Sequence, residues 1–385
     1  MNYSAILAST CIALFLAIPA QAFAASDQET AAAEAYKKRV ELANDIKKMR
    51  AMRKELPMPP PSGLFGVYAF PEQGQFVTGI NYQQHKFSGL LQGSDSISAQ
   101  QAVLTAPNPF FGNPGQPPTL RVVPKSAQAD VIFPFINYAI NDQFALLGLA
   151  PLIKKKNVLE TFAGANPMQS LGTFEVNTSG IGDIKFGALY KAYNSADKNH
   201  NVIIDVVMSA PTGSITEQDY NLTPMNTYVK TRLPYGMQLG SGTWDALVGV
   251  AYWGKEKKWG WGAQYLATIP LESENSEGWR YGDKHEGTAW LSYEWEPTFN
   301  SSLRLRTEQQ GTIKGIDPAI YGPGLGANPD NYGGTRTELS LGANWMYAPA
   351  HNISIEIAQP IAQDRKGVQV EHDQSIMLSW RNAFF

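Results

Sequence analysis

Three short segments carry side chains that could bind a polar solute. They are Gly180–Asp183, Pro211–Gly213 and Met237–Asp245. The three segments lie at the ends of consecutive predicted strands, so they are expected to meet at one rim of the sheet. Two carboxylates and an amide at this rim could bind a cation or a polar group of a passing molecule. Alternatively, the glycines and aspartates shape bends and pair with Lys185 or with a loop. The candidate solute-binding residues at this rim are Asp183, Lys185, Gln238 and Asp245.

Charged residues also recur at alternate positions along the C-terminal half of the chain. Alternation places them on one face of each predicted strand, and neighbouring strands offer both signs. Cross-strand ion pairs could fill an interior, or opposed acidic and basic sides could orient polar solutes. The residues expected to line this interior are Glu294, Glu296, Arg304, Arg306, Glu308, Arg336, Glu338, Glu356 and Arg381.

Catalytic and cofactor chemistry find little support in the sequence. A Ser/His pair would suit an outer-membrane lipid hydrolase, but His372 precedes Ser375 by three residues, so strand alternation places them on opposite faces. The five histidines are scattered, and no glycine-rich loop opens a helix. We therefore expect no enzyme, no metal and no cofactor.

The elements that position these residues are strands. From Gly63 onward the apolar period is two, as in Ala289, Leu291, Tyr293 and Trp295. Aromatic residues gather near the strand ends, as a membrane girdle requires. Only a closed barrel lets strands cross lipid without unpaired backbone groups. We therefore predict an all-β fold, a transmembrane antiparallel β-barrel of about 12 strands with an N-terminal periplasmic helix.

The C-terminal segment supports the same fold. Ile376–Phe385 is a hydrophobic strand ending in Phe385, as expected for the last strand of a bacterial outer-membrane barrel. Alternation places the apolar side chains of this segment on the same face of the strand as Phe384 and not on that of Phe385.

The predicted connections alternate between short and long, as in barrels with short periplasmic turns and long outer loops. Counting strands from Gln75 gives twelve, and Leu64–Phe70 could add one, so ten to fourteen is the expected range. Short joins are expected at 141–142, 194–201, 254–258, 297–300 and 348–352. Long joins are expected at 88–127, 155–179, 211–241, 271–284, 312–335 and 363–370.

Two prolines interrupt this regular pattern. Pro134 lies in an apolar stretch, Val131–Ile140, and Pro151 lies in Phe144–Ile153. Proline in a closed sheet predicts a bulge or bend. Such a bend could be a plain kink or could open the wall locally.

The N-terminal region is organised differently. Residues 1–24 have an apolar core and the small residues Ala22 and Ala24, which predict a signal peptide cleaved before Ala25. Asp27–Leu56 predicts a helix that ends before a proline-rich linker. This helix could remain in the periplasm, bind a periplasmic partner, or enter the lumen as a plug. The expected domains are 1–24, 25–62 and the barrel 63–385.

Composition excludes several other classes. The net charge of −3 and the pI near 6.0 argue against nucleic acid as a partner. Cys11 is the single cysteine and lies in the leader, so the mature chain has no disulfide or thiolate metal site.

The rim segments also carry a family resemblance. Gly180–Tyr190, Pro211–Gly213 and Met237–Asp245 resemble signatures of the outer-membrane transporter-like family named for the meta-pathway of phenol degradation. The resemblance spans about Gly63 to Phe385. It implies a barrel related in role to hydrophobic-solute channels such as long-chain fatty acid transporters, but it does not identify the solute.

Together these features predict a Gram-negative outer-membrane channel for passive passage of small solutes of aromatic or hydrophobic character. Its expected partners are the lipid bilayer with its outer-membrane lipids and the small-molecule solute. The alternatives are a closed barrel that serves as a structural or docking component, and an outer-membrane lipid hydrolase.

Overall fold

The computed structural model describes Glu34, residues 36–41, Asn44, and residues 60–66, 73–348 and 351–384. The chain divides into two compact units, Met1–Lys48 and Met49–Phe385. In the first unit the described residues are helical and exposed, which agrees with the predicted Asp27–Leu56 helix. The rest of that helix, the predicted leader and Phe385 lie outside the described residues. Within the described part of the chain, no helix has the length and apolarity needed to cross a membrane.

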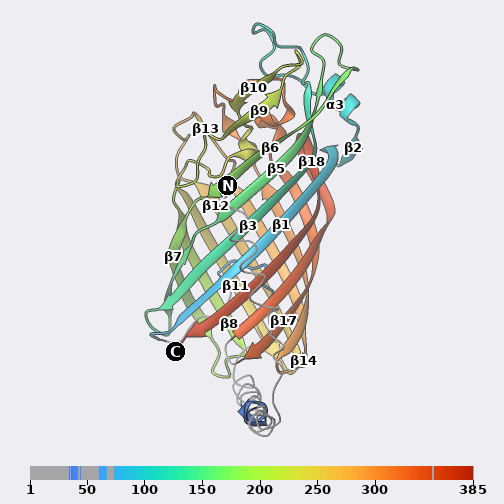
Figure 1. Ribbon diagram of the computed structural model, residues 1–385. Helices are drawn as coiled ribbons and strands as arrows, with labels where there is room; N and C mark the ends of the chain where they lie inside the picture. Colours follow the sequence, from blue (N-terminus) through green and yellow to red (C-terminus); the bar gives the residue numbers. More distant parts are fainter. Residues whose placement is uncertain are drawn as a thin grey trace, which may run out of the picture. The chain divides into compact units, whose positions relative to one another are not determined.

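In the second unit an antiparallel sheet closes on itself (Figure 1). Each strand of the ring pairs with its neighbours, and β1 pairs with both β3 and β18. Closure pairs each of the elements named below on both sides, as a membrane-spanning sheet requires. The ring elements are β1 (Phe76–Gly93), β3 (Val122–Ala139), β4 (Phe144–Leu149), β7 (Lys185–Asn194), β8 (His200–Ser209), β11 (Asp245–Glu256), β12 (Trp259–Pro270), β14 (Lys284–Glu296), β15 (Phe299–Gln310), β17 (Gly334–Ala348) and β18 (His351–Phe384).

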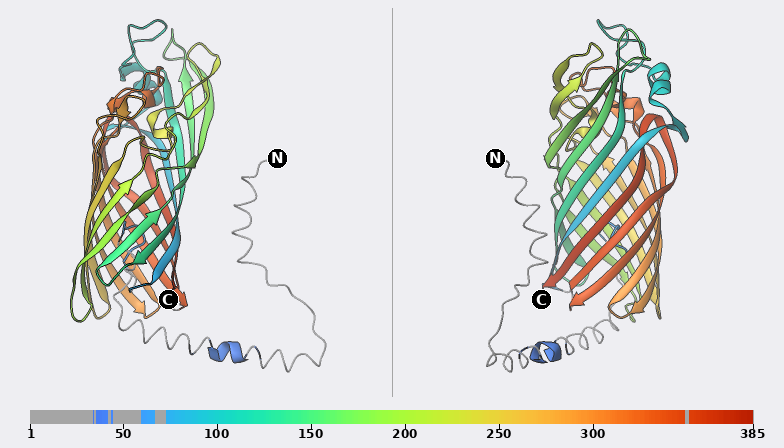
Figure 2. Two further views of the ribbon diagram at one scale, coloured as in Figure 1. Left: turned by 90° about the vertical axis from the view of Figure 1, so that its left-hand side faces the viewer. Right: turned by 45° about the vertical axis from the view of Figure 1, so that its right-hand side comes forward.

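The last element, β18, supplies two strands of this ring. Its first arm pairs with β17 up to Arg365, and its second arm pairs with β1 from Arg365 to Phe384. A ring in which every neighbouring pair is antiparallel cannot close with an odd number of strands. The 34-residue element β18 therefore reverses its direction, and it does so near Gly367, which has a φ of 62°. Ten other ring elements plus these two arms make twelve, which confirms the predicted strand number. Figure 2 shows β1 beside β3 and beside the C-terminal strand.

Two neighbouring strands of the twelve are interrupted, one of them at Pro151. β4 continues into β5 (Leu152–Phe162) after a break at Pro151, and β6 (Ser170–Ile181) continues into β7 after a break at residues 182–184. The predicted bend at Pro151 is therefore confirmed. Pro134 instead stays inside β3, where its carbonyl accepts a hydrogen bond from the Ala150 amide at 3.3 Å.

Apolar side chains point outward from the ring, as the alternation predicts. An exposed aliphatic band includes Ile80, Val206, Leu303, Leu341 and Ile357. Exposed aromatic residues surround the end of the barrel with short turns, where a membrane interface would place them. They are Phe76, Tyr138, Phe144, Tyr193, Tyr252, Trp259, Trp295, Phe299, Trp345 and Trp380.

The five predicted short connections are confirmed and mark one end of the barrel, called here the turn end. The opposite end, the loop end, carries the long connections. Three of these are shorter than predicted. β1 and β3 extend into the predicted 88–127 connection and leave residues 94–121. β5–β6 and the arms of β18 continue as strands to the turns at residues 163–169 and 366–367. The predicted extra strand at Leu64–Phe70 is wrong for residues 64–66, which are not in a strand; residues 67–70 lie outside the described residues.

The long connections fold into a cap over the loop end (Figure 1). Tyr235 and Trp279 are fully buried in one apolar cluster of this cap. Burial raises the pKa of Tyr235 to about 12. Arg232 holds Asp317 at 2.8 Å across the cap. The cap elements are β2 (Asp95–Ile97), α3 (Ala99–Thr105), β9 (Gln218–Leu222), β10 (Tyr228–Arg232), η1 (Tyr235–Met237), β13 (Trp279–Arg280), β16 (Lys314–Gly315), η2 (Leu325–Ala327) and η3 (Pro329–Asn331).

Candidate functional site

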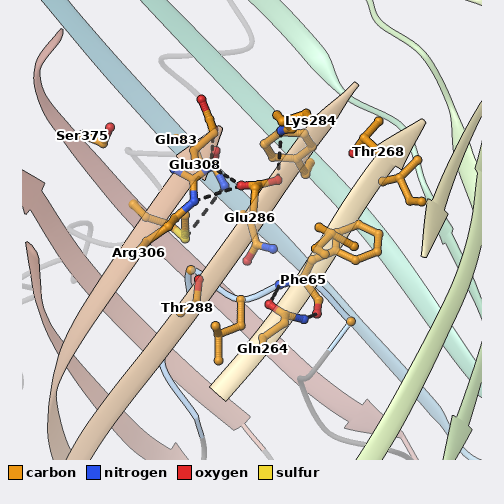
Figure 3. A pocket seen from close by; sticks show the side chains of 18 of the residues that line it. Phe65, Gln83, Gln264, Thr268, Lys284, Glu286, Thr288, Arg306, Glu308 and Ser375 are labelled. Atoms are coloured by element: carbon orange, nitrogen blue, oxygen red, sulfur yellow. Dashed lines mark hydrogen bonds and ion pairs between the residues drawn. The ribbon is translucent and has the colours of Figure 1, made fainter. Parts of the chain in front are cut away.

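The barrel lumen contains a cavity of about 600 Å³ (Figure 3). A second cavity of about 520 Å³ shares several of its lining residues and also contacts the cap residue Tyr281. The shared residues are His85, Asp245, Thr268, Lys284 and Glu308. The two spaces therefore lie one above the other and form a path inside the ring.

The three rim segments meet where the β6–β7 strand is interrupted. Above this point β6 has no ring partner on the β8 side, since β8 pairs with β7 and β11. The carboxylate of Asp183 occupies the gap and accepts hydrogen bonds from the amides of Gly213 at 2.9 Å and Ser241 at 2.7 Å. A Cβ on Gly240 would lie 2.5 Å from the carbonyl oxygen of Gly213, so the two glycines allow the segments to approach this closely.

Three of the four predicted rim residues line the lumen. Asp183, Lys185 and Asp245 all face the larger cavity, and Lys185 and Asp245 both lie opposite Ser209 of β8. Gln238 does not line either cavity. Its side chain is buried among the loops, where it accepts a hydrogen bond from the Glu217 amide and donates one to the Leu233 carbonyl.

One side of the lumen is a network of charges (Figure 3). Arg306 donates to Glu338 at 2.8 Å, to Glu308 at 2.6 Å and to Glu286 through its Nε at 2.9 Å. Arg336 and Lys284 pair with the same carboxylates, at 3.3 Å to Glu338 and 3.0 Å to Glu286. Three cations and three carboxylates thus balance each other in this network.

The remaining predicted lumen residues have separate positions. Arg304 pairs with Glu356, its Nε lying 3.0 Å from the carboxylate, and both side chains line the cavity with the network. Glu294 pairs with Lys255 at 2.9 Å near the turn end, and Arg381 donates to Asn344 at 3.3 Å. Neither Glu294 nor Arg381 lines the cavity. Glu296 is exposed beside the turn to β15.

The other side of the lumen carries the apolar lining of the cavity. Side chains from β3, β4, β11 and β12 form it, and they are Phe133, Phe135, Leu147, Leu149, Leu247 and Leu266. Gln264 and Thr268 of β12 and Asp245 at the rim add polar groups to this side. The cavity therefore has one charged wall and one apolar wall, and a solute with both characters fits between them.

A segment before the first strand lies inside the lumen. The side chain of Gln264 donates to the Phe65 carbonyl at 2.5 Å and accepts from the Phe65 amide at 3.4 Å. The Gly63 amide donates to Glu356 at 3.4 Å. Leu64, 1% exposed, packs into an apolar cluster with Leu147, Leu247 and Leu266. Residues 60–66, called here the plug segment, thus form the floor of the cavity.

Asp205 of β8 lies beneath this segment. It is fully buried, and neither carboxylate oxygen has a hydrogen-bond partner in the described part of the chain. Gly66 adopts a φ of 69° directly beside it, and a Cβ there would lie 2.7 Å from both oxygens. Glycine is therefore required at this position of the plug segment.

One expectation from the sequence is wrong. His372 and Ser375 do not face opposite sides, because Ser375 Oγ lies 3.0 Å from His372 Nε2. The register between β1 and β18 shifts between Phe87↔His372 and Lys86↔Gln374, so Asp373 is an extra residue. This β-bulge returns both side chains to the lumen. Ser375 Oγ also lies 2.7 Å from His85 Nδ1.

Several lumen residues were not singled out from the sequence. Lys284 and Glu286 lie an even number of residues before Glu294 on the same strand. Strand alternation therefore predicts that they face the lumen as well. The plug segment and the His372–Ser375 contact gave no such signal. Among the described residues, no group of three or more His, Cys, Asp or Glu side chains could hold a metal ion.

Comparisons with known proteins support the fold. No family model and no curated protein matches the chain. An outer-membrane channel from Pseudomonas putida F1 is 14% identical, with a TM-score of 0.54 over 83% of this chain and 98% of that chain. A FadL homologue from Pseudomonas aeruginosa is 9% identical, over 81% and 91% of the two chains, with a TM-score of 0.39. The toluene transporter TodX of P. putida is 10% identical, over 82% and 91%, with a TM-score of 0.39. The P. putida F1 channel and this chain share one fold, a closed antiparallel barrel.

Proposed function

We propose that this chain is a channel of a Gram-negative outer membrane through which small amphipathic solutes, aromatic ones included, pass by diffusion. The observation that carries the proposal is the cavity of about 600 Å³ with one charged and one apolar wall inside a closed barrel. Its volume lies in the range of about 300–1,000 Å³ that suits small organic ligands. The structural likeness to an outer-membrane channel is consistent with this role.

The two walls would select solutes together. An aromatic ring gains by burial against Phe133, Phe135 and Leu147, while a hydroxyl or carboxylate of the same molecule can exchange hydrogen bonds with the charged wall. A carbohydrate would leave the apolar wall unused. A pure hydrocarbon would gain nothing from the charged wall.

The plug segment would control the lower end of this path. Its contacts with Gln264 and Glu356 are few, and two of these three hydrogen bonds are long, at 3.4 Å. Passage therefore requires the segment to move or to rearrange within the lumen. The resting channel is expected to conduct weakly and to open in discrete steps.

The test is single-channel recording of the refolded mature protein in planar bilayers, together with uptake into proteoliposomes. An aromatic alcohol and a carbohydrate of similar size form the solute pair. Preferential uptake of the aromatic alcohol, and block of the ionic current by it, are expected. Leu247→Gln places an amide on the apolar wall at similar volume and should remove this preference, whereas the lipid-facing Val248→Gln should keep it. Equal uptake of both solutes would refute the proposal. So would the absence of conductance both in the mature protein and in a variant that lacks residues 60–66.

A further inference from the structure

Three side chains, one on β17 and two on the second arm of β18, form a chain of contacts that passage of solutes does not need. Ser375 Oγ lies 3.0 Å from His372 Nε2, and His372 Nδ1 lies 3.1 Å from Glu338 Oε1. A hydroxyl, an imidazole and a carboxylate in this order are the groups that activate a serine for acyl transfer. The Ser375–His372 contact is a hydrogen bond, and the His372–Glu338 contact is close but not yet aligned as one. Such contacts commonly tighten when a substrate binds.

Two irregularities of the sheet create this arrangement. The bulge at Asp373 brings Ser375 and His372 to the same side of the wall. A second register shift, between Thr337↔Ala362 and Glu338↔Pro360, leaves Ile361 as an extra residue opposite Glu338. The Gln363 amide exchanges hydrogen bonds with the backbone N–H and C=O of His372, at 3.2 and 3.0 Å. Bulges re-aim side chains and occur often beside active sites.

The surroundings fix His372 in a productive orientation. Its side chain is fully buried, and its ring packs against Phe87 with a centroid separation of 4.8 Å. The Glu338 carboxylate forms ion pairs with Arg306 Nη1 at 2.8 Å and with Arg336 Nε at 3.3 Å, and these two cations favour its charged form. A charged carboxylate beside Nδ1 favours the tautomer that leaves Nε2 free to accept the Ser375 proton.

The cavity beside Ser375 has the other parts that an ester needs. Ser375, Phe87 and Phe133 line the same cavity, so an aryl or short acyl group can rest on the aromatic rings. Gln83 also lines it, and its amide reaches just the Met377 sulfur at 3.9 Å among the described residues. This amide is therefore available to an ester carbonyl oxygen. The site faces the lumen and not the lipid, which favours small esters over membrane phospholipids.

We propose that the lumen contains an esterase site in which Ser375 is the nucleophile, His372 the general base and Glu338 a positioning residue. Ser375 Oγ bonds to the carbonyl carbon of a small ester while its proton moves to His372 Nε2. The C–O bond to the alcohol breaks, and the leaving alkoxide takes that proton. Water then attacks the acyl-serine, gives a proton to His372, and releases the acid as the proton returns to Ser375 Oγ. Atoms balance as ester plus water giving acid plus alcohol.

The test uses the full mature protein in detergent micelles and two probes, 4-nitrophenyl acetate and an alkyl fluorophosphonate. The wild-type chain should hydrolyse the ester, and mass spectrometry should find the phosphonyl group on Ser375. Ser375→Ala and His372→Gln should lose both the hydrolysis and the label. Ser209→Ala removes another cavity-lining serine and should keep both. Gln83→Leu should lower kcat by about 10²-fold with KM little changed.

Folding and passage are checked separately by heat-dependent gel mobility and by conductance. Ser375→Ala should conduct as the wild type does, so loss of hydrolysis and loss of the channel are distinguishable. Glu338→Gln should lower kcat and change its pH profile, which a merely structural role would not do. The proposal is overturned if the wild type neither hydrolyses the ester nor takes the label. It is also overturned if Ser375→Ala hydrolyses at the wild-type rate, or if the label lies on another residue.

Discussion

The charged wall of the lumen, on β14, β15, β17 and the first arm of β18, differs from the apolar wall on β3, β4, β11 and β12 in what holds it together. The charged wall is held by ion pairs between its own side chains, because Arg306 and its neighbours form a balanced set of charges. The apolar wall is covered at its lower end by Leu64 of the plug segment. A change on the charged wall should therefore disturb the barrel, whereas a change on the apolar wall should disturb the plug.

Removing the centre of the charged wall should have the largest effect. In Arg306→Gln the carboxylates of Glu286, Glu308 and Glu338 lose their shared cation. Breaking a buried pair costs about 3–5 kcal/mol of unfolding free energy, and the uncompensated charge should shift ion selectivity toward cations. Urea unfolding and the reversal potential in a salt gradient measure the two effects. An unchanged reversal potential would show that ions do not pass this wall.

On the apolar wall, Leu64→Ala should weaken docking of the plug segment and leave the barrel intact. Loss of a buried leucine side chain costs about 2–5 kcal/mol, here in the free energy that keeps the segment in the lumen. Single-channel recordings should show more frequent openings, with unchanged thermal unfolding of the barrel. Leu64→Met, which nearly conserves volume, is the matched control. Equal destabilisation of the barrel by Leu64→Ala would remove the distinction between the two walls.

The rim between the walls should respond less strongly. In Asp183→Asn one of the two backbone amides, that of Gly213 or that of Ser241, loses its acceptor. An unsatisfied buried donor costs about 1–3 kcal/mol. Faster proteolysis of the loops at the interrupted β6–β7 strand is expected, and Asp183→Glu, which keeps the charge, separates charge from geometry. Solute affinity falling without faster proteolysis would instead favour the predicted solute-binding role.

The smallest effect is expected at a turn that belongs to neither wall. The Ser195 hydroxyl and the Asn199 amide hold the pKa of Asp197 at about 2, below its ordinary value of 3.8. Because the pKa is depressed on folding, the stabilisation is present above about pH 4 and is lost as the pH falls toward 2. Amide exchange at Asn199 should therefore increase in that window. Amide exchange in Asp197→Asn should show no such pH dependence. The substitution should leave the conductance, which depends on the two walls, unchanged.

Much of this barrel follows from the sequence because alternation has a strict physical cause. Leu303 and Leu305 must face lipid, so Arg304 and Arg306 must face the lumen, and the twelve strands follow from the turns between them. A bulge breaks this rule with one residue. Nothing in the composition around Asp373 distinguishes it from a regular strand, which is why His372 and Ser375 were placed on opposite faces.

The plug segment escaped prediction for a different reason. Leu64 and Phe65 are apolar residues at the start of a period-two region, so they resemble the beginning of a strand. Their position depends on side chains almost 200 residues or more away, namely Gln264 and Glu356. Rim residue Gln238 is similar, because its partners lie in loops whose packing no local pattern encodes.

The pairing of β1 with the second arm of β18 constrains how the molecule is assembled. The first and last strands meet along this seam, from Phe76↔Phe384 to Gly93↔Arg365, so the cylinder remains open until the whole polypeptide has been delivered. The plug segment precedes β1 in the chain. Either the segment enters the lumen after the barrel has closed, or it is already inside when β1 pairs with β18. In the second case the last strand pairing encloses it.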